Sequence, residues 1–175
     1  IVEDCRSLSL AMGHNGRVNQ PVLSSIMTNP HYNGCFRHVA VWLYHGAGTV
    51  FIQDANSLVL ATATLVEALR YLQEKVPGTT RITSYARSST IARKGLVDMK
   101  EIRAAGLDRI HIGLESGSDR VLKFIQKGVR AKEHVDAGRK VIDAGMTLSE
   151  YVMPGLGGKA LSRDHAVETA RVLNA

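Results

Sequence analysis

The chain has 175 residues, of which 45% are hydrophobic and 22% charged, and its net charge is +6. This length suits one domain with a sizeable core, and the composition excludes disordered, collagen-like and disulfide-rich proteins. No apolar run approaches the ~20 residues of a membrane span. The scattered cations, with only 5% aromatic residues, argue against nucleic acid as a partner.

The first third of the chain has weak patterning. Residues 7–12 alternate between polar and apolar side chains, which predicts a half-buried strand. Residues 21–27 predict a short helix that ends before an Asn-Pro pair, since the residue before proline disfavours helical backbone. Residues 38–45 predict another short helix, ended by glycines.

From residue 49 onward, short apolar runs alternate with amphipathic segments. The apolar runs predict strands, and the segments with apolar residues at helical spacing predict helices. The predicted strands are 49–53, 81–85, 109–114 and 148–153, and the predicted helices are 62–75, 96–105, 119–126, 131–144 and 163–173. Thr62 and Ser162 are the predicted N-caps of the first and last of these helices.

The order of these elements predicts the sheet. Strands that recur roughly every 30 to 40 residues with a helix between them form right-handed βαβ units and a parallel sheet. An open or partial (β/α) barrel is our first interpretation and a doubly wound sheet the second, because periodicity alone does not distinguish them.

Polar residues follow each predicted strand, at the edge where α/β folds hold their ligands. The candidates from this edge are Gln53, Asp54, Asn56, Ser84, Arg87, Glu115, Ser116, Gly155, Gly157 and Gly158. Arg87 offers a planar fork for a carboxylate, and Gln53, Asp54 and Glu115 offer acceptors for an ammonium group or hydroxyls.

Each candidate also has a purely structural interpretation. Asp54 and Asn56 could end a strand and cap the next turn, and Arg87 could pair with a surface carboxylate. Residues 155–158 could cradle a phosphate or simply turn the chain. Glu115 is the strongest candidate, because a carboxylate between glycines at the end of a buried strand needs a partner.

Four stretches taken together resemble one family. They are residues 51–58, 82–87, 110–117 (Ile-His-Ile-Gly-Leu-Glu-Ser-Gly) and 148–158. In order and spacing they are similar to the core of radical S-adenosylmethionine (radical SAM) enzymes, in the branch related to oxygen-independent coproporphyrinogen oxidases. The resemblance implies an α/β fold, a partial (β/α)6 TIM-like barrel with parallel strands, in one domain over residues 1–175.

The resemblance also implies cofactors and residue roles. The expected cofactors are S-adenosylmethionine and a 4Fe–4S cluster, which together generate a 5′-deoxyadenosyl radical. Gln53 and Asp54 occupy the place of the family's stretch that holds the methionine amino group, with Asn56 beside them. Ser84 and Arg87 correspond to ribose and carboxylate contacts, Glu115 and Ser116 to the Gly-Leu-Glu-Ser motif, and the three loop glycines to the region beside the adenine.

The chain departs from the family at its cluster motif. The family carries CxxxCxxC after the first strand, whereas this chain has only Cys5 and Cys35, thirty positions apart. The region near residues 13–48, where the cluster loop would lie, is therefore atypical, and Cys35 remains as a single candidate metal ligand. Either the cluster loop is not part of this chain or the cluster site has been lost.

We therefore expect a cytoplasmic radical SAM enzyme of oxidoreductase or transferase type. Its expected partners are a small-molecule substrate and an external electron donor, with no membrane involved. One alternative is a degenerate barrel that binds a nucleoside ligand without radical chemistry. Another is an unrelated (β/α) barrel enzyme that binds a phosphate at residues 155–158.

Overall fold

The computed structural model describes residues 19–45, 48–53, 56–76 and 78–175. The predicted strand at 7–12, together with Cys5 and Asp54, lies outside the described residues. Within them, helices and strands alternate from β1 onward, as the sequence predicts. No helix in the described ranges is long and apolar enough to cross a membrane.

The sheet has four parallel strands in the order of the chain. They are β1 (Thr49–Ile52), β2 (Arg81–Ala86), β3 (Leu107–Glu115) and β4 (Thr147–Val152), and each pairs with the next. A doubly wound sheet would reverse its strand order at a switch point, and these four strands show no reversal. The partial-barrel prediction is therefore confirmed, and the described strands give no support to the doubly wound alternative.

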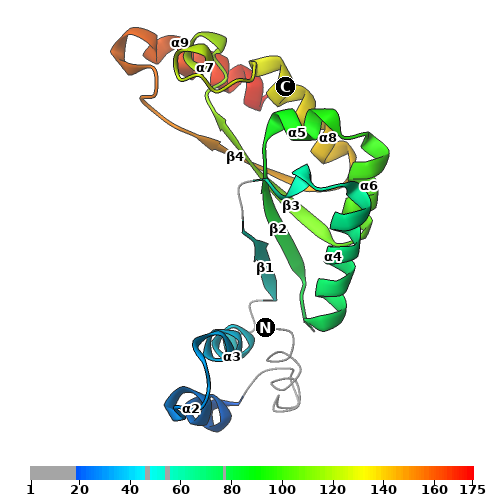
Figure 1. Cartoon of the computed structure of the whole chain (residues 1–175). Helices are drawn as coiled ribbons and strands as arrows, with labels where there is room; N and C mark the ends of the chain where they lie inside the picture. Colours follow the sequence, from blue (N-terminus) through cyan, green and yellow to red (C-terminus); the bar gives the residue numbers. More distant parts are fainter. Residues whose placement is uncertain (1–18, 46–47, 54–55, 77) are drawn as a thin grey trace.

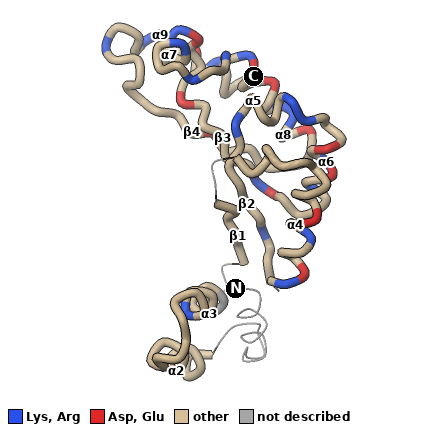
Figure 2. The backbone as a smooth tube through the Cα atoms, viewed as in Figure 1, with Lys and Arg blue, Asp and Glu red and all other residues tan. Residues whose placement is uncertain are grey.

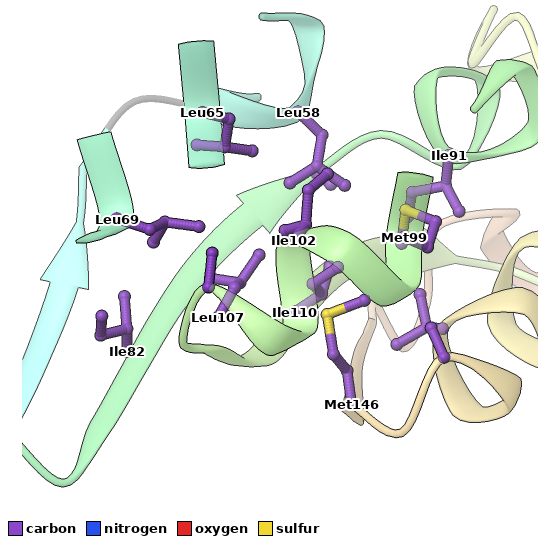
Figure 3. Close-up of a cluster of buried hydrophobic side chains, with 14 of the residues drawn as sticks. Leu58, Leu65, Leu69, Ile82, Ile91, Met99, Ile102, Leu107, Ile110 and Met146 are labelled. Atoms are coloured by element: carbon purple, nitrogen blue, oxygen red, sulfur yellow. The ribbon is translucent and has the colours of Figure 1, made fainter. Parts of the chain in front are cut away.

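One face of the sheet is covered by helices. Helices α4 (Thr62–Lys75), α5 (Ser88–Arg93), α6 (Leu96–Ala104) and α8 (Ala131–Asp143) all lie on the same side in Figure 1. Their apolar side chains pack on those strand residues that alternate toward them, as a period of two requires. Figure 3 shows this core, in which Leu58, Leu69, Ile82, Ile102 and Ile110 are fully buried.

The opposite face carries no helix over the middle of the strands in the part of the chain that the structure describes (Figure 1). We call it the open face. Alternation along the strands places Phe51, Tyr85, His111 and Tyr151 on it, because Ile82, Ile110 and Leu148 point into the helix-covered core. In a closed barrel, this face would be the interior.

The remaining helices lie at the two ends of the sheet. Helices α2 (Gln20–Thr28) and α3 (Gly34–His45) pack on each other through Ile26 and Ala40, and Trp42 Nε1 donates to the Thr49 carbonyl over 3.0 Å. Figure 2 shows few charges on them, in contrast to the outer helices. Helices α7 (Asp119–Phe124) and α9 (Gly158–Leu173) lie together at the other end (Figure 1).

The elements from residue 49 onward agree with the sequence prediction, apart from shifts of one or two residues at several element ends and three larger local differences. Thr62 is not the N-cap of α4: Ala61 takes that position, and the Thr62 hydroxyl accepts from Lys94 Nζ over 3.2 Å. Helix α9 begins at Gly158, not after Ser162, because residues 159–161 are compatible with helix. Helix α5 was not predicted, because its serines and threonine show no amphipathic pattern, although the helix buries Ile91.

Candidate functional site

A cavity of about 1010 Å³ lies at the C-terminal ends of β1, β2 and β3. Its lining includes Gln53 after β1, Tyr85 and Arg87 at the end of β2, Gly113 of β3, and Lys127 from the loop after α7. This is the edge of the sheet at which parallel α/β folds bind ligands. The structure thus brings two predicted residues, Gln53 and Arg87, to one cavity.

The loop that carries Arg87 is held by a predicted site residue. Asn56 Oδ1 accepts from the backbone N–H of Arg87 over 3.1 Å, and Asn56 Nδ2 donates to Thr90 Oγ1 over 2.9 Å. Both polar ends of Asn56 are therefore used in tying the end of β1 to the start of α5. The Arg87 side chain is exposed and lines the cavity, and no carboxylate among the described residues pairs with it.

Ser84 lies on the other side of the same strand. It is fully buried on the helix-covered face, and its hydroxyl donates to Ser57 Oγ over 2.9 Å. The side chain therefore supports the loop after β1 and does not line the cavity. The position of Ser84 at the strand end follows from the sequence, whereas the face that it occupies depends on the packing of the sheet.

Glu115 ends β3 at a break in the strand register. Gly113 pairs with Tyr151 and Glu115 with Val152, so Leu114 is an extra residue, and Glu115 has a φ of +63°. Its Oε1 accepts from Lys127 Nζ. The predicted carboxylate thus has the partner that partial burial demands.

Gly113 gives this ion pair its space. A Cβ at Gly113 would lie 3.2 Å from Lys127 Nζ and 3.3 Å from Glu115 Oε1. Both contacts are tighter than side-chain packing normally allows, so a larger residue would require the pair to shift by a few tenths of an ångström. The pair is mostly buried beside the cavity, with about a quarter of each side chain exposed.

The next two residues of the motif have a structural role. Ser116 is fully buried, with its Oγ 2.8 Å from His165 Nδ1 and accepting from the Ser118 N–H over 3.0 Å. Gly117 donates its N–H to Thr169 Oγ1 over 2.9 Å, and a Cβ there would lie 2.4 Å from a carbonyl oxygen of α9. Ser116 and Gly117 therefore fasten α9 to the end of β3.

The glycine loop does not line this cavity. Gly155 and Gly158 have φ values of +83° and +61° with open space around them, so each permits a turn that other residues resist. Gly157 has a different reason to be glycine, because a Cβ would lie 2.6 Å from Leu161 and 3.0 Å from Val121. The proposed adenine contact of these glycines stays a prediction.

His134 was missed by the sequence analysis. It lies on α8, lines the cavity, is 1% exposed, and places Nδ1 2.6 Å from the buried Ser88 hydroxyl. Burial, and then the nearby Lys127, lower the pKa of His134 to about 4. The ring is therefore neutral at pH 7, and its Nε2 is buried without a partner among the described residues.

Four aromatic rings form a continuous row across the open face, leading from the cavity to β4. We call Phe51, Tyr85, His111 and Tyr151 the aromatic row. Ring centroids lie 4.9 Å apart for Phe51–Tyr85, 5.7 Å for Tyr85–His111 and 5.5 Å for His111–Tyr151. Such spacings suit edge and tilted aromatic contacts. The row needs the strand register, so the only sequence signal for it was alternation within each strand.

The residues present do not fit the expected iron–sulfur cluster. Three thiolates are required, and the 175 residues include two cysteines. Cys35 is exposed on α3, and nowhere in the described ranges do three His, Cys, Asp or Glu side chains form a metal-binding group. The prediction of Cys35 as a ligand therefore lacks supporting neighbours.

Comparison with known proteins agrees with this fold. A family model for the radical SAM superfamily matches residues 42–171. Two solved structures are similar, both of the cobalamin-dependent S-adenosylmethionine radical enzyme OxsB. The one with aqua-cobalamin is 22% identical with a TM-score of 0.55, and the one that also contains S-adenosylmethionine is 21% identical with a TM-score of 0.56.

These structures are much longer than this chain. The matches cover 78% and 81% of this chain but only 20% and 21% of the OxsB chains, so this chain spans about a fifth of their length. At such identity the likeness shows the fold alone. No curated protein matches, and the coproporphyrinogen oxidase branch stays a prediction.

Proposed function

Because the chain belongs to the radical SAM superfamily, we propose that it binds S-adenosylmethionine in the cavity at the C-terminal ends of its strands. The observation that carries this proposal is the exposed Arg87 guanidinium, which lines the cavity beside Gln53 without a described carboxylate partner. The cavity volume, about 1010 Å³, lies at the upper end of the range for ligand sites.

The lining matches the chemical groups of this ligand. The planar Arg87 guanidinium can hold the methionyl carboxylate through two parallel N–H bonds. The Gln53 amide oxygen can accept from the methionyl ammonium group. Glu115, the partner of the lining residue Lys127, can accept from ribose hydroxyls.

The family's radical chemistry also requires a cluster that delivers one electron to the sulfonium of S-adenosylmethionine and releases a 5′-deoxyadenosyl radical. The chain has two cysteines, and the described residues include no metal-binding group, so the ligands for this cluster are not found here. The proposal is therefore restricted to ligand binding by this part of a radical SAM enzyme. The radical step, its electron donor and its substrate remain expectations.

Isothermal titration of the 175-residue chain with S-adenosylmethionine tests the proposal. We expect one site, with affinity reduced at least fivefold by Arg87→Gln. Arg93→Gln on α5 is a matched control, because Arg93 is exposed and outside the cavity lining. Absence of binding by the folded chain, or equal losses in both variants, would refute the proposal. Separate titrations with adenosine and methionine identify which half of the ligand Arg87 recognises.

The cysteine count favours a second candidate function, binding of the same ligand without radical chemistry. Anaerobic reconstitution of the full-length natural protein with iron and sulfide, followed by electron paramagnetic resonance and an assay for 5′-deoxyadenosine, distinguishes the two. A cluster signal with 5′-deoxyadenosine formation would exclude the second candidate. Ligand binding by the full-length protein without either would support it.

A further inference from the structure

Below the aromatic row, the open face carries two arginines. Arg81 is the first residue of β2. Arg109 lies in β3, where it pairs with Thr83 of β2 and Thr147 of β4. Alternation places Arg81 on the face of Tyr85 and Arg109 on the face of His111. We call Arg81 and Arg109 the cationic pair. The open face thus has one tier of aromatic rings and, toward the N-terminal ends of the strands, one tier of positive charge.

The cationic pair has no negative partner among the described residues. The ion pairs of the described chain involve other side chains, and Arg109 Nε is buried without a hydrogen-bond partner. His111 Nδ1 is also buried and unpartnered. Buried polar atoms without partners are rare in folded proteins, because burial removes their hydrogen bonds to water.

The lowered pKa of His111 agrees with two positive charges beside it on the open face. Burial, and then the charges of Arg109 and Arg81, lower the pKa of His111. Both guanidinium groups therefore act on the imidazole, which itself belongs to the aromatic row at 5.5 to 5.7 Å from three other rings. The two tiers meet at His111.

These groups together define the chemistry of a ligand. A carboxylate or phosphate would compensate the two guanidinium groups and accept from the unpartnered nitrogen of Arg109. A flat unsaturated ring attached to that anion would contact Tyr85, His111 and Tyr151, of which Tyr151 is 46% exposed. The anion would then lie below the ring, farther from the cavity that holds Arg87.

We propose that the open face binds the substrate of this enzyme, and that this substrate is a planar unsaturated ring bearing a carboxylate or phosphate group. The identification of this ligand as the substrate rests on the proposed function. The recognition of an anionic ring depends only on the residues of the open face. Arg109 recognises the anion, Arg81 adds charge, and the aromatic row holds the ring.

The test uses three probes that share one ring system. These are 2-naphthoate, 2-naphthyl phosphate and the neutral 2-naphthamide, each titrated into the isotope-labelled 175-residue chain and followed by nuclear magnetic resonance of the His111 and Tyr151 rings. We expect at least one anionic probe to bind fivefold or more tightly than the amide and to raise the pKa of His111. Which anion binds better identifies the group that the substrate carries.

Arg109→Gln should weaken binding of the anionic probe at least fivefold, and Arg81→Gln should weaken it by a smaller factor. Arg81 is exposed at the start of its strand, so this second variant is expected to fold even if the first does not. Arg70→Gln, on the exposed surface of α4, is the control and should change nothing.

Equal binding of the amide and both anions, no binding of any probe by the folded chain, or full affinity in folded Arg81→Gln would overturn the inference. Titration with S-adenosylmethionine separates it from the proposed function. Both cationic-pair variants should retain affinity for S-adenosylmethionine, whereas Arg87→Gln should retain affinity for the anionic probe. Failure of one ligand alone identifies which of the two conclusions is wrong.

Discussion

The folded chain should lose stability as the pH falls from 7 to 5, because His134 is protonated in the unfolded chain before it is protonated in the folded one. The imidazole is 1% exposed, and burial followed by the charge of Lys127 lowers its pKa from 6.5 to about 4. A group with a lowered pKa in the folded state binds its proton more readily when unfolded. The stability that neutral His134 contributes is therefore fully present above pH 6.5 and is lost as the pH falls through 4.

The shift sets the size of the effect. A change of about 2.5 pKa units corresponds to about 3 kcal/mol once the pH is below both values. At pH 5 the unfolded chain is almost fully protonated at this residue while the folded chain is mostly neutral, so about 2 kcal/mol is already lost. This is a large fraction of the 5–15 kcal/mol typical of a folded domain.

Urea denaturation followed by circular dichroism at pH 7 and pH 5 measures this loss. His134→Gln keeps a side chain that can bond to the Ser88 hydroxyl but cannot take up the proton, so its stability should fall by about 2 kcal/mol less than that of the unsubstituted chain. Other groups that titrate in this range are common to both proteins and cancel in the difference. His38→Gln, an exposed histidine on α3, should keep the full pH dependence. Equal pH dependence in the His134 variant and the unsubstituted chain would refute the argument.

Two further substitutions test the end of β3. Gly117→Ala should lower the free energy of unfolding by about 1–3 kcal/mol, because its Cβ would lie 2.4 Å from backbone of α9; thermal melts should show no comparable effect for Gly34→Ala, which has open space. Glu115→Gln removes the charge that pairs with Lys127 and should weaken S-adenosylmethionine binding several-fold in titration calorimetry, with a small change in melting temperature. Unfolding of that variant with normal binding in the remaining folded fraction would favour a structural role for Glu115.

Local patterns predicted most of the sheet and its helices. Helix α4 has the predicted bounds, and all four described strands lie where the apolar runs predict them. These elements could be predicted because the spacing of apolar residues within each strand and each amphipathic helix already shows which side is buried. Helix α5 was missed for the opposite reason: Ser88 and Thr90 are buried polar residues whose partners, His134 and Asn56, lie far away in the sequence.

The candidate site was predictable in part. The rim position of Gln53 and Arg87 follows from strand ends, and the structure brings both to one cavity. The partner of Glu115 did not follow, because its +63° φ and the irregular pairing with β4 turn the carboxylate toward Lys127. The faces of Ser84 and Ser116 likewise depend on tertiary packing, so their burial could not be read from strand ends.

The order of the strands has a consequence for how the chain folds. Ile52 pairs with Ser84, Ser84 with Ile110, and Ile110 with Leu148, so each described strand pairing closes within a single βαβ unit. Contacts of this moderate sequence separation give a lower contact order than a sheet whose neighbours come from opposite ends of the chain. Each unit can form on the edge left by the unit before it, while the ribosome is still synthesising the next one.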